Sequence, residues 1–139
     1  MTAACPFCAG AGGVVLWQDA HCRVVRADEA DYPGFLRVVA HAHVREMSDL
    51  PAAAQQALMR VVFAAEAALR QTLAPDKVNL ASLGNVVPHL HWHVIPRFVD
   101  DPHFPNPVWG ARLRDTPRPA PADLDARLAA RLQRLLGPG

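Results

Sequence analysis

The sequence predicts an α+β domain in which about five antiparallel strands form a sheet that packs against one long helix and one C-terminal helix. Two segments repeat apolar residues at helical spacing, and five short apolar runs have the length of strands. The expected helices and strands do not alternate along the chain, as they do in proteins built on a parallel sheet. With 139 residues and no internal repeat, the chain is expected to form one domain over residues 1–139.

The long helix is predicted over residues 48–73, where apolar side chains recur every three or four positions. Ser48 or Asp49 is expected to cap its start, and Pro51 suits the first turn. Pro75 is expected to stop it. The stripe that would face the sheet consists of Leu58, Val61, Val62, Ala65, Leu69 and Leu73.

The C-terminal part combines a proline-rich segment with the second helix. Six of the thirteen prolines fall within residues 100–121, which predicts an extended surface segment there. Residues 122–136 then carry a leucine stripe, with Asp123 near the start and Gly137 after the end. We therefore expect a C-terminal helix over residues 122–136.

The five apolar runs are short, as half-buried strands are. They predict strands over residues 14–17, 22–26, 35–40, 77–83 and 89–98.

Composition excludes several classes of function. The formal net charge is +1 and the basic residues are scattered, so duplex nucleic acid is not an expected partner. A secretion signal and an apolar run of membrane-spanning length are both missing from the sequence, so we expect a cytoplasmic protein without a membrane partner. The odd number of cysteines, Cys5, Cys8 and Cys22, argues against a disulfide framework.

Three histidines alternate with large apolar residues in the stretch GNVVPHLHWHVIPR. On a strand His89, His91 and His93 share one face. At a rise of about 3.3 Å per residue, neighbours in this row lie roughly 6.6 Å apart along the strand and the outer pair roughly 13 Å. A zinc ion with bonds of about 2 Å can bind two neighbours but hardly all three. We therefore expect the three histidines to have different functions.

This alternation resembles the His-φ-His-φ-His-φ-φ signature of the histidine triad superfamily of nucleotide hydrolases and transferases. The segment over residues 100–110 looks like that of a bacterial branch loosely called diadenosine polyphosphate hydrolases. Further similarities lie in Cys-Pro-Phe-Cys at the N-terminus, Pro33-Gly34 before a strand, His43 after it, Asn79 on the next strand, Gly84-Asn85 before the histidines and Ile95-Pro96-Arg97 after them.

The resemblance implies that His91 attacks the α-phosphorus of an adenosine phosphoramidate or a dinucleoside polyphosphate. A neutral imidazole would attack with one nitrogen while the other donates its proton to a fixed acceptor. A covalent nucleotidyl-histidine would form, and water would release the monophosphate. His93 would orient the phosphate oxygens and stabilise their charge. Purine nucleotides or dinucleotides are thus the expected ligands.

Four further residues are expected to contact this substrate. Asp28 would bind the ribose hydroxyls, although a solvated turn is an equal alternative. Asn85 stands where the family usually has glutamine. Asn79 is either a substrate contact or a capped strand end, and Arg97 either steers phosphate or forms a surface ion pair.

Phe35 departs from the family pattern, because many members carry another histidine at this position. Phe35 and Asn85 together favour an alternative function, a nucleotide-binding or scaffolding module with little turnover.

The resemblance also implies a structural zinc bound by Cys5, Cys8, His43 and His89. Two thiolates and two imidazoles make a closed tetrahedral shell that would hold the N-terminus to the sheet. His41 is a rival to His43, and free thiols, a redox pair or an open catalytic zinc on the first two histidines of the row are alternatives. We expect no organic cofactor.

A homodimer is implied as well. The alanines of the long helix would suit close packing across a twofold axis. They are Ala57, Ala64, Ala65 and Ala68.

Overall fold

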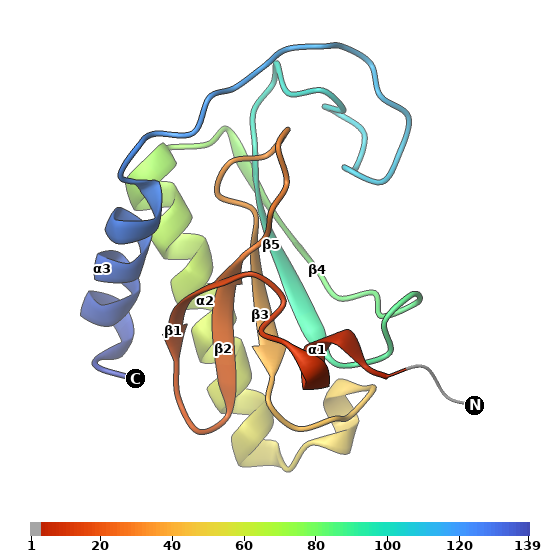
Figure 1. Cartoon of the computed structure of the whole chain (residues 1–139), viewed down its shortest axis with the longest axis vertical. Helices are drawn as coiled ribbons and strands as arrows, with labels where there is room; N and C mark the ends of the chain where they lie inside the picture. The colour runs from red at the N-terminus through yellow and green to blue at the C-terminus, as the bar shows by residue number, and fades with distance from the viewer. Residues whose placement is uncertain (1–3) are drawn as a thin grey trace.

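An antiparallel sheet organises the fold in this computed structural model, which describes residues 4–139 (Figure 1). In spatial order the strands are β1 (Val14–Gln18), β2 (Cys22–Arg26), β3 (Leu36–Ala40), β5 (His91–Arg97) and β4 (Lys77–Ala81). The helices are α1 (Pro6–Ala9), the 3-10 turn η1 (Met47–Asp49), α2 (Ala52–Leu73) and α3 (Leu124–Leu136). The predicted α+β fold with its five-stranded antiparallel sheet is confirmed.

The main core lies between the sheet and α2, with α3 packed against α2 and β1. Alternate residues of the central strands, such as Val24, Val38 and Val94, are completely buried there. Leu58 and Leu69 of α2 meet them as the predicted stripe. Burial of each of these leucines stabilises the fold by about 1.5–3 kcal/mol.

Three of the four alanines expected at a dimer interface are buried within the chain itself. Ala65 and Ala68 are fully buried in it, and Ala64 is buried as well. The expectation that these alanines pack across a twofold axis is therefore wrong for Ala64, Ala65 and Ala68, which the chain itself already buries, whereas Ala57 is partly buried. Homodimer formation itself stays a prediction.

The start of α2 also differs from the prediction. Pro51 is the N-cap residue and the helix begins at Ala52. Asp49 belongs to η1, where its carboxylate accepts hydrogen bonds from the backbone N–H groups of Glu46 and Arg45 at 3.0 and 3.3 Å. The helix ends as expected just before Pro75.

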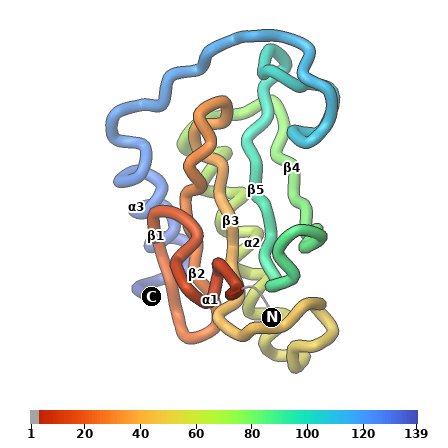
Figure 2. The backbone as a smooth tube through the Cα atoms, turned by 45° about the vertical axis from the view of Figure 1, so that its right-hand side comes forward, coloured from red at the N-terminus to blue at the C-terminus, as the bar shows by residue number. Residues whose placement is uncertain are grey.

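The other face of the sheet is covered by two segments far apart in sequence. The turn α1, which the sequence did not predict, lies in front of the sheet on the side away from α2 (Figure 1). The proline-rich residues 100–121 form neither helix nor strand. They follow β5, fold back at the upper end of the sheet and cross to α3 (Figure 2).

No helix among residues 4–139 is long and apolar enough to cross a membrane.

Candidate active site and metal centre

The histidine row lies on the sheet face opposite α2, which we call the triad face. The register pairs His93 with Arg37 and His91 with Val39 of β3, so these side chains share this face. β5 begins at His91, which places His89 just before the strand. The exposed fractions of His89, His91 and His93 are only 1%, 6% and 7%.

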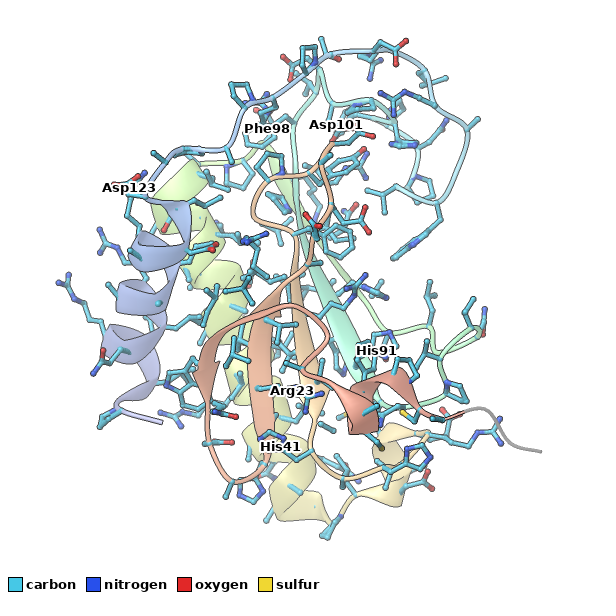
Figure 3. The ribbon with its side chains drawn as sticks, viewed as in Figure 1. Arg23, His41, His91, Phe98, Asp101 and Asp123 are labelled. Atoms are coloured by element: carbon cyan, nitrogen blue, oxygen red, sulfur yellow. The ribbon has the colours of Figure 1, made fainter. Side chains whose placement is uncertain are left out.

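His91 has a defined orientation. Its Nδ1 lies 2.6 Å from the carbonyl oxygen of His89. Because a carbonyl only accepts, Nδ1 carries the hydrogen and Nε2 keeps the lone pair. Burial lowers the pKa of His91, which favours the neutral ring. The ring packs edge-on against Phe7 of α1, at a centroid distance of 4.8 Å, and Figure 3 shows His91 beside α1.

His93 sits among aromatic rings. Its centroid lies 5.7 Å from that of Phe35, 4.9 Å from that of His91 and 4.9 Å from that of Trp109. Burial, followed by the charges of His91 and Arg37, lowers the pKa of His93 to about 4. Its Nδ1 is buried and finds no hydrogen-bond partner within residues 4–139. His93 is thus a neutral ring packed among aromatic rings, with Arg37 opposite it and the half-exposed Trp109 beside it.

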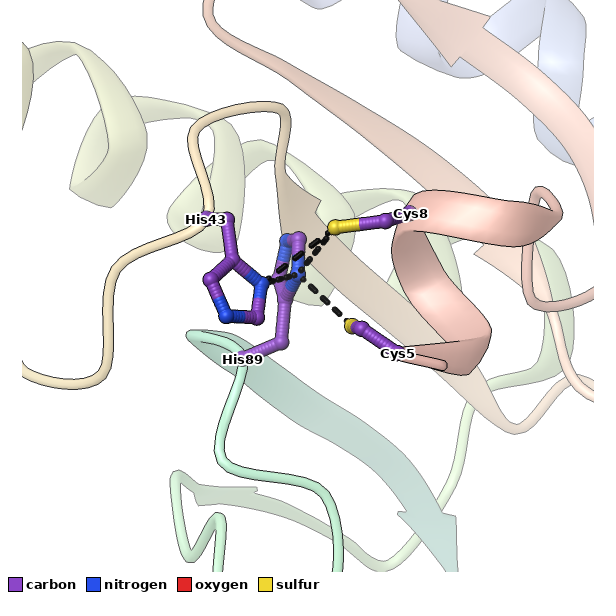
Figure 4. Close-up of side chains that lie close together, drawn as sticks. All are labelled: Cys5, Cys8, His43 and His89. Atoms are coloured by element: carbon purple, nitrogen blue, oxygen red, sulfur yellow. Dashed lines mark hydrogen bonds between the residues drawn. The ribbon is translucent and has the colours of Figure 1, made fainter. Parts of the chain in front are cut away.

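Cys5, Cys8, His43 and His89 come together in one cluster (Figure 4). The Nδ1 of His89 lies 3.2 Å from the sulfur of Cys5, 3.6 Å from that of Cys8 and 3.2 Å from Nδ1 of His43. The sulfur of Cys8 lies 3.3 Å from Nδ1 of His43. A tetrahedral zinc with Zn–N near 2.0 Å and Zn–S near 2.3 Å needs edges of roughly 3.3–3.8 Å. These four distances are close to such edges and all four donor atoms lie within 4.8 Å of one another, so the donor set fits zinc.

The tautomer of His89 also fits a metal ligand. Its Nε2 donates to the carbonyl oxygen of Ala40 at 2.6 Å, which leaves the lone pair on Nδ1, inside the cluster. His91 is outside the cluster and its Nδ1 is bonded to a carbonyl. The donors that the structure brings together are therefore those of the closed set, and His91 is not among them.

His41, the rival ligand, points elsewhere. Its ring lies within 3.2 Å of Arg23 and 3.0 Å of the carbonyl oxygen of Asp19. Arg23, which is 7% exposed, also donates to the carbonyl oxygens of Phe7 and Gly10 at 2.7 and 3.1 Å. Arg23 thus holds the cysteine-bearing turn on the sheet, and Figure 3 labels it beside α1.

The four residues predicted to contact the substrate lie in different environments. Arg97 is 2% exposed, pairs with Asp101 at 2.7 Å and donates to the side-chain oxygen of Asn79 at 2.7 Å. The ion pair is therefore buried rather than on the surface. Asp28 lines a groove with residues 118–122, and none of the histidines lines that groove. Asn85 is exposed in the loop between β4 and β5.

Four residues near the site were not predicted from the sequence. Phe7 and Trp109 contact the histidine rings, and Arg37 lies opposite His93. Arg37 was detectable as the charged residue within an otherwise apolar strand. His103 is half-buried, with its Nδ1 2.6 Å from the hydroxyl of Tyr32.

Comparisons with known proteins identify the family of this chain. Residues 11–100 match the HIT domain family. A histidine triad protein from Marinobacter aquaeolei VT8 is 34% identical, with a TM-score of 0.70 over 91% of this chain and 90% of that chain. One from Bradyrhizobium japonicum is 30% identical, with a TM-score of 0.73 over 91% and 92%.

A Zn-bound histidine triad family protein from Mycobacterium smegmatis shares the fold at 22% identity, with a TM-score of 0.70 over 95% of each chain. A comparison with curated proteins finds no match. The family match spans well over half of the chain and the 34% identical structure covers nine-tenths of it. The chain therefore belongs to the HIT domain family.

Proposed function

We propose that this protein is a nucleotide hydrolase or nucleotidyl transferase in which His91 attacks the α-phosphate of an adenosine phosphoramidate or a dinucleoside polyphosphate. One observation carries the proposal, the hydrogen bond from Nδ1 of His91 to the carbonyl of His89. It holds a neutral imidazole with the lone pair on Nε2, which is the state that covalent catalysis requires. The substrates are those of the diadenosine polyphosphate hydrolase-like branch that the sequence resembles.

The reaction takes two displacements. The lone pair of Nε2 forms a bond to the α-phosphorus, and the bond from phosphorus to the bridging oxygen or nitrogen breaks, its electron pair leaving with that atom. A bridging oxygen leaves as a phosphate anion. A phosphoramidate nitrogen takes a proton from solvent water as the bond breaks, so that ammonia leaves. Nδ1 keeps its hydrogen throughout and continues to donate it to the carbonyl oxygen of His89. Water then attacks phosphorus and loses a proton to solvent, and the P–N pair returns to Nε2. His93 lies beside the phosphate oxygens in this mechanism, while Asp28, Asn79 and Asn85 remain proposed substrate contacts.

We further propose a structural zinc at Cys5, Cys8, His43 and His89. Support comes from the fit of the four donors and from the description of the Mycobacterium smegmatis protein as Zn-bound. The metal would fix α1, and with it Phe7, against the triad face.

The test compares wild type with His91→Ala. Each is mixed with excess adenosine 5'-phosphoramidate or diadenosine tetraphosphate, quenched without acid and examined by intact-mass spectrometry. A nucleotidyl adduct in wild type alone supports the proposal, provided that the circular dichroism spectra of the two proteins agree. Saturable nucleotide binding with neither adduct nor released monophosphate would instead establish the binding-module alternative.

A further inference from the structure

Arginines from β2, β3 and β5 lie on the triad face, and two of them are occupied by internal acceptors. Arg23 donates to three backbone carbonyl oxygens at 2.7–3.1 Å. Arg97 donates to Asp101, to Asn79 and to a backbone carbonyl, also at 2.7–3.1 Å. Both side chains are more than nine-tenths buried, so their hydrogen bonds stabilise the fold and are not free for a ligand.

Arg37 is held differently from these two. Its guanidinium lies 3.5 Å from the carbonyl oxygen of Gly12 and 3.8 Å from a carboxylate oxygen of Glu29. Charge-assisted hydrogen bonds are normally about 2.7–2.9 Å long. The Arg37 side chain is 22% exposed, yet that of Glu29 is 47% exposed, so this ion pair stabilises the fold little. Arg37 is a largely desolvated cation with weak partners, a state that an anionic ligand would improve.

The position of Arg37 places this charge at the proposed reaction site. Arg37 lies directly opposite His93, and side chains in such pairs have Cβ atoms roughly 4.5–5.5 Å apart. Its guanidinium carbon is 5.4 Å from the ring centroid of Phe35, which in turn packs edge-on against His93. Arg37 therefore adjoins the position where Phe35 replaces the family's additional histidine. The Arg37 guanidinium thus supplies a positive charge next to the position where many members of the family carry a histidine.

From this placement we infer that Arg37 binds the phosphate chain of the substrate and favours leaving groups that depart as anions. The inference rests on the proposed function and narrows its substrate class to dinucleoside polyphosphates. When the bond from the α-phosphorus to the bridging oxygen breaks, its electron pair stays on the departing phosphate, whose negative charge increases. The guanidinium fork binds that charge through paired N–H groups. The amine released from a phosphoramidate takes up a proton and gains no negative charge.

The experiment measures kcat/KM of wild type, Arg37→Gln and Arg37→Lys on diadenosine tetraphosphate and on adenosine 5'-phosphoramidate. Arg112→Gln is the matched control, because Arg112 forms ion pairs on the surface. We expect Arg37→Gln to reduce kcat/KM for the tetraphosphate roughly 10- to 100-fold, since hydrogen bonds to charged groups contribute about 1.5–3 kcal/mol. The loss on the phosphoramidate should stay below about 3-fold. Arg37→Lys should recover part of the loss, because it keeps the charge without the fork.

Equal losses on both substrates, or no loss on either, would overturn the inference. A binding measurement separates this result from failure of the proposed function. His91→Ala and the double variant His91→Ala/Arg37→Gln are titrated with ATP and with AMP by calorimetry. Weaker binding of ATP with unchanged binding of AMP supports phosphate-chain recognition by Arg37 even if wild type turns over neither substrate. Unchanged ATP binding refutes it.

Discussion

The Nδ1 nitrogen of His91 and the carbonyl oxygen of His89 lie 2.6 Å apart, which links two neighbouring histidines of opposite tautomer. His89 donates through Nε2 to the carbonyl of Ala40 and keeps its lone pair on Nδ1, in the metal cluster. His91 donates through Nδ1 and keeps its lone pair on Nε2. Backbone carbonyls fix both tautomers, so the fold determines which nitrogen of each ring is free for the proposed metal and for the proposed attack.

This arrangement predicts an NMR result. In ¹⁵N-labelled protein at pH 7.5, long-range ¹H–¹⁵N spectra should show His91 as the neutral tautomer with hydrogen on Nδ1, and His89 with hydrogen on Nε2. Assignment uses His91→Gln and His89→Gln. Observation of His91 with its hydrogen on Nε2 would contradict the proposed nucleophile.

The zinc cluster predicts different outcomes for two nearby histidines. His43→Ala removes a ligand, so zinc per chain after dialysis should fall from about one to near zero. The melting temperature should fall as well, because metal binding contributes to folding. His41→Ala is the control and should keep its zinc. Elemental analysis and thermal unfolding with and without chelator provide the measurements. Equal zinc content in the two variants would rule out this ligand set.

The sequence predicted the features that depend on local periodicity. The leucine stripes placed α2 and α3, and the alternation around His91 placed the row on one face. Residue spacing alone could not decide between alternatives that depend on contacts between residues far apart in the sequence. His41 and His43 are two residues apart, and only the packing of His41 against Arg23 separates them. Helical periodicity likewise does not distinguish a helix face that meets its own sheet from one that meets another chain, which is why the alanine interface was wrong.

The buried pair of Arg97 and Asp101 predicts a large loss of stability when one partner is removed. Although burial alone would raise the pKa of Asp101, hydrogen bonds from Arg97 and from backbone N–H groups hold it well below its usual range. Arg97→Met leaves that carboxylate buried and unpaired, which should reduce the free energy of unfolding by about 3–5 kcal/mol. Arg112→Met, which breaks exposed pairs, should cost less than about 1 kcal/mol. Urea unfolding at neutral pH measures both, and similar losses would contradict the structural role of Arg97.

The lowered pKa of His93 predicts a specific dependence of stability on pH. Its pKa is about 4 in the folded protein, lowered by burial and by the nearby charges of His91 and Arg37, and about 6.5 in an unfolded chain. Between these values the unfolded state binds more protons, so the free energy of unfolding falls as the pH is lowered. From pH 7 to pH 5 His93 alone should account for a loss of about 2 kcal/mol.

Comparison with His93→Gln isolates this contribution, because glutamine keeps a polar side chain but does not titrate. Urea unfolding of both proteins at several pH values between 7 and 5 gives the difference in their free energies. Carboxylates titrate in both proteins and cancel in that difference. The difference should shrink by about 2 kcal/mol as the pH falls, since only wild type loses the contribution of a neutral buried imidazole. Parallel curves for the two proteins would show that His93 titrates normally, and its buried, unpartnered Nδ1 would then need another explanation.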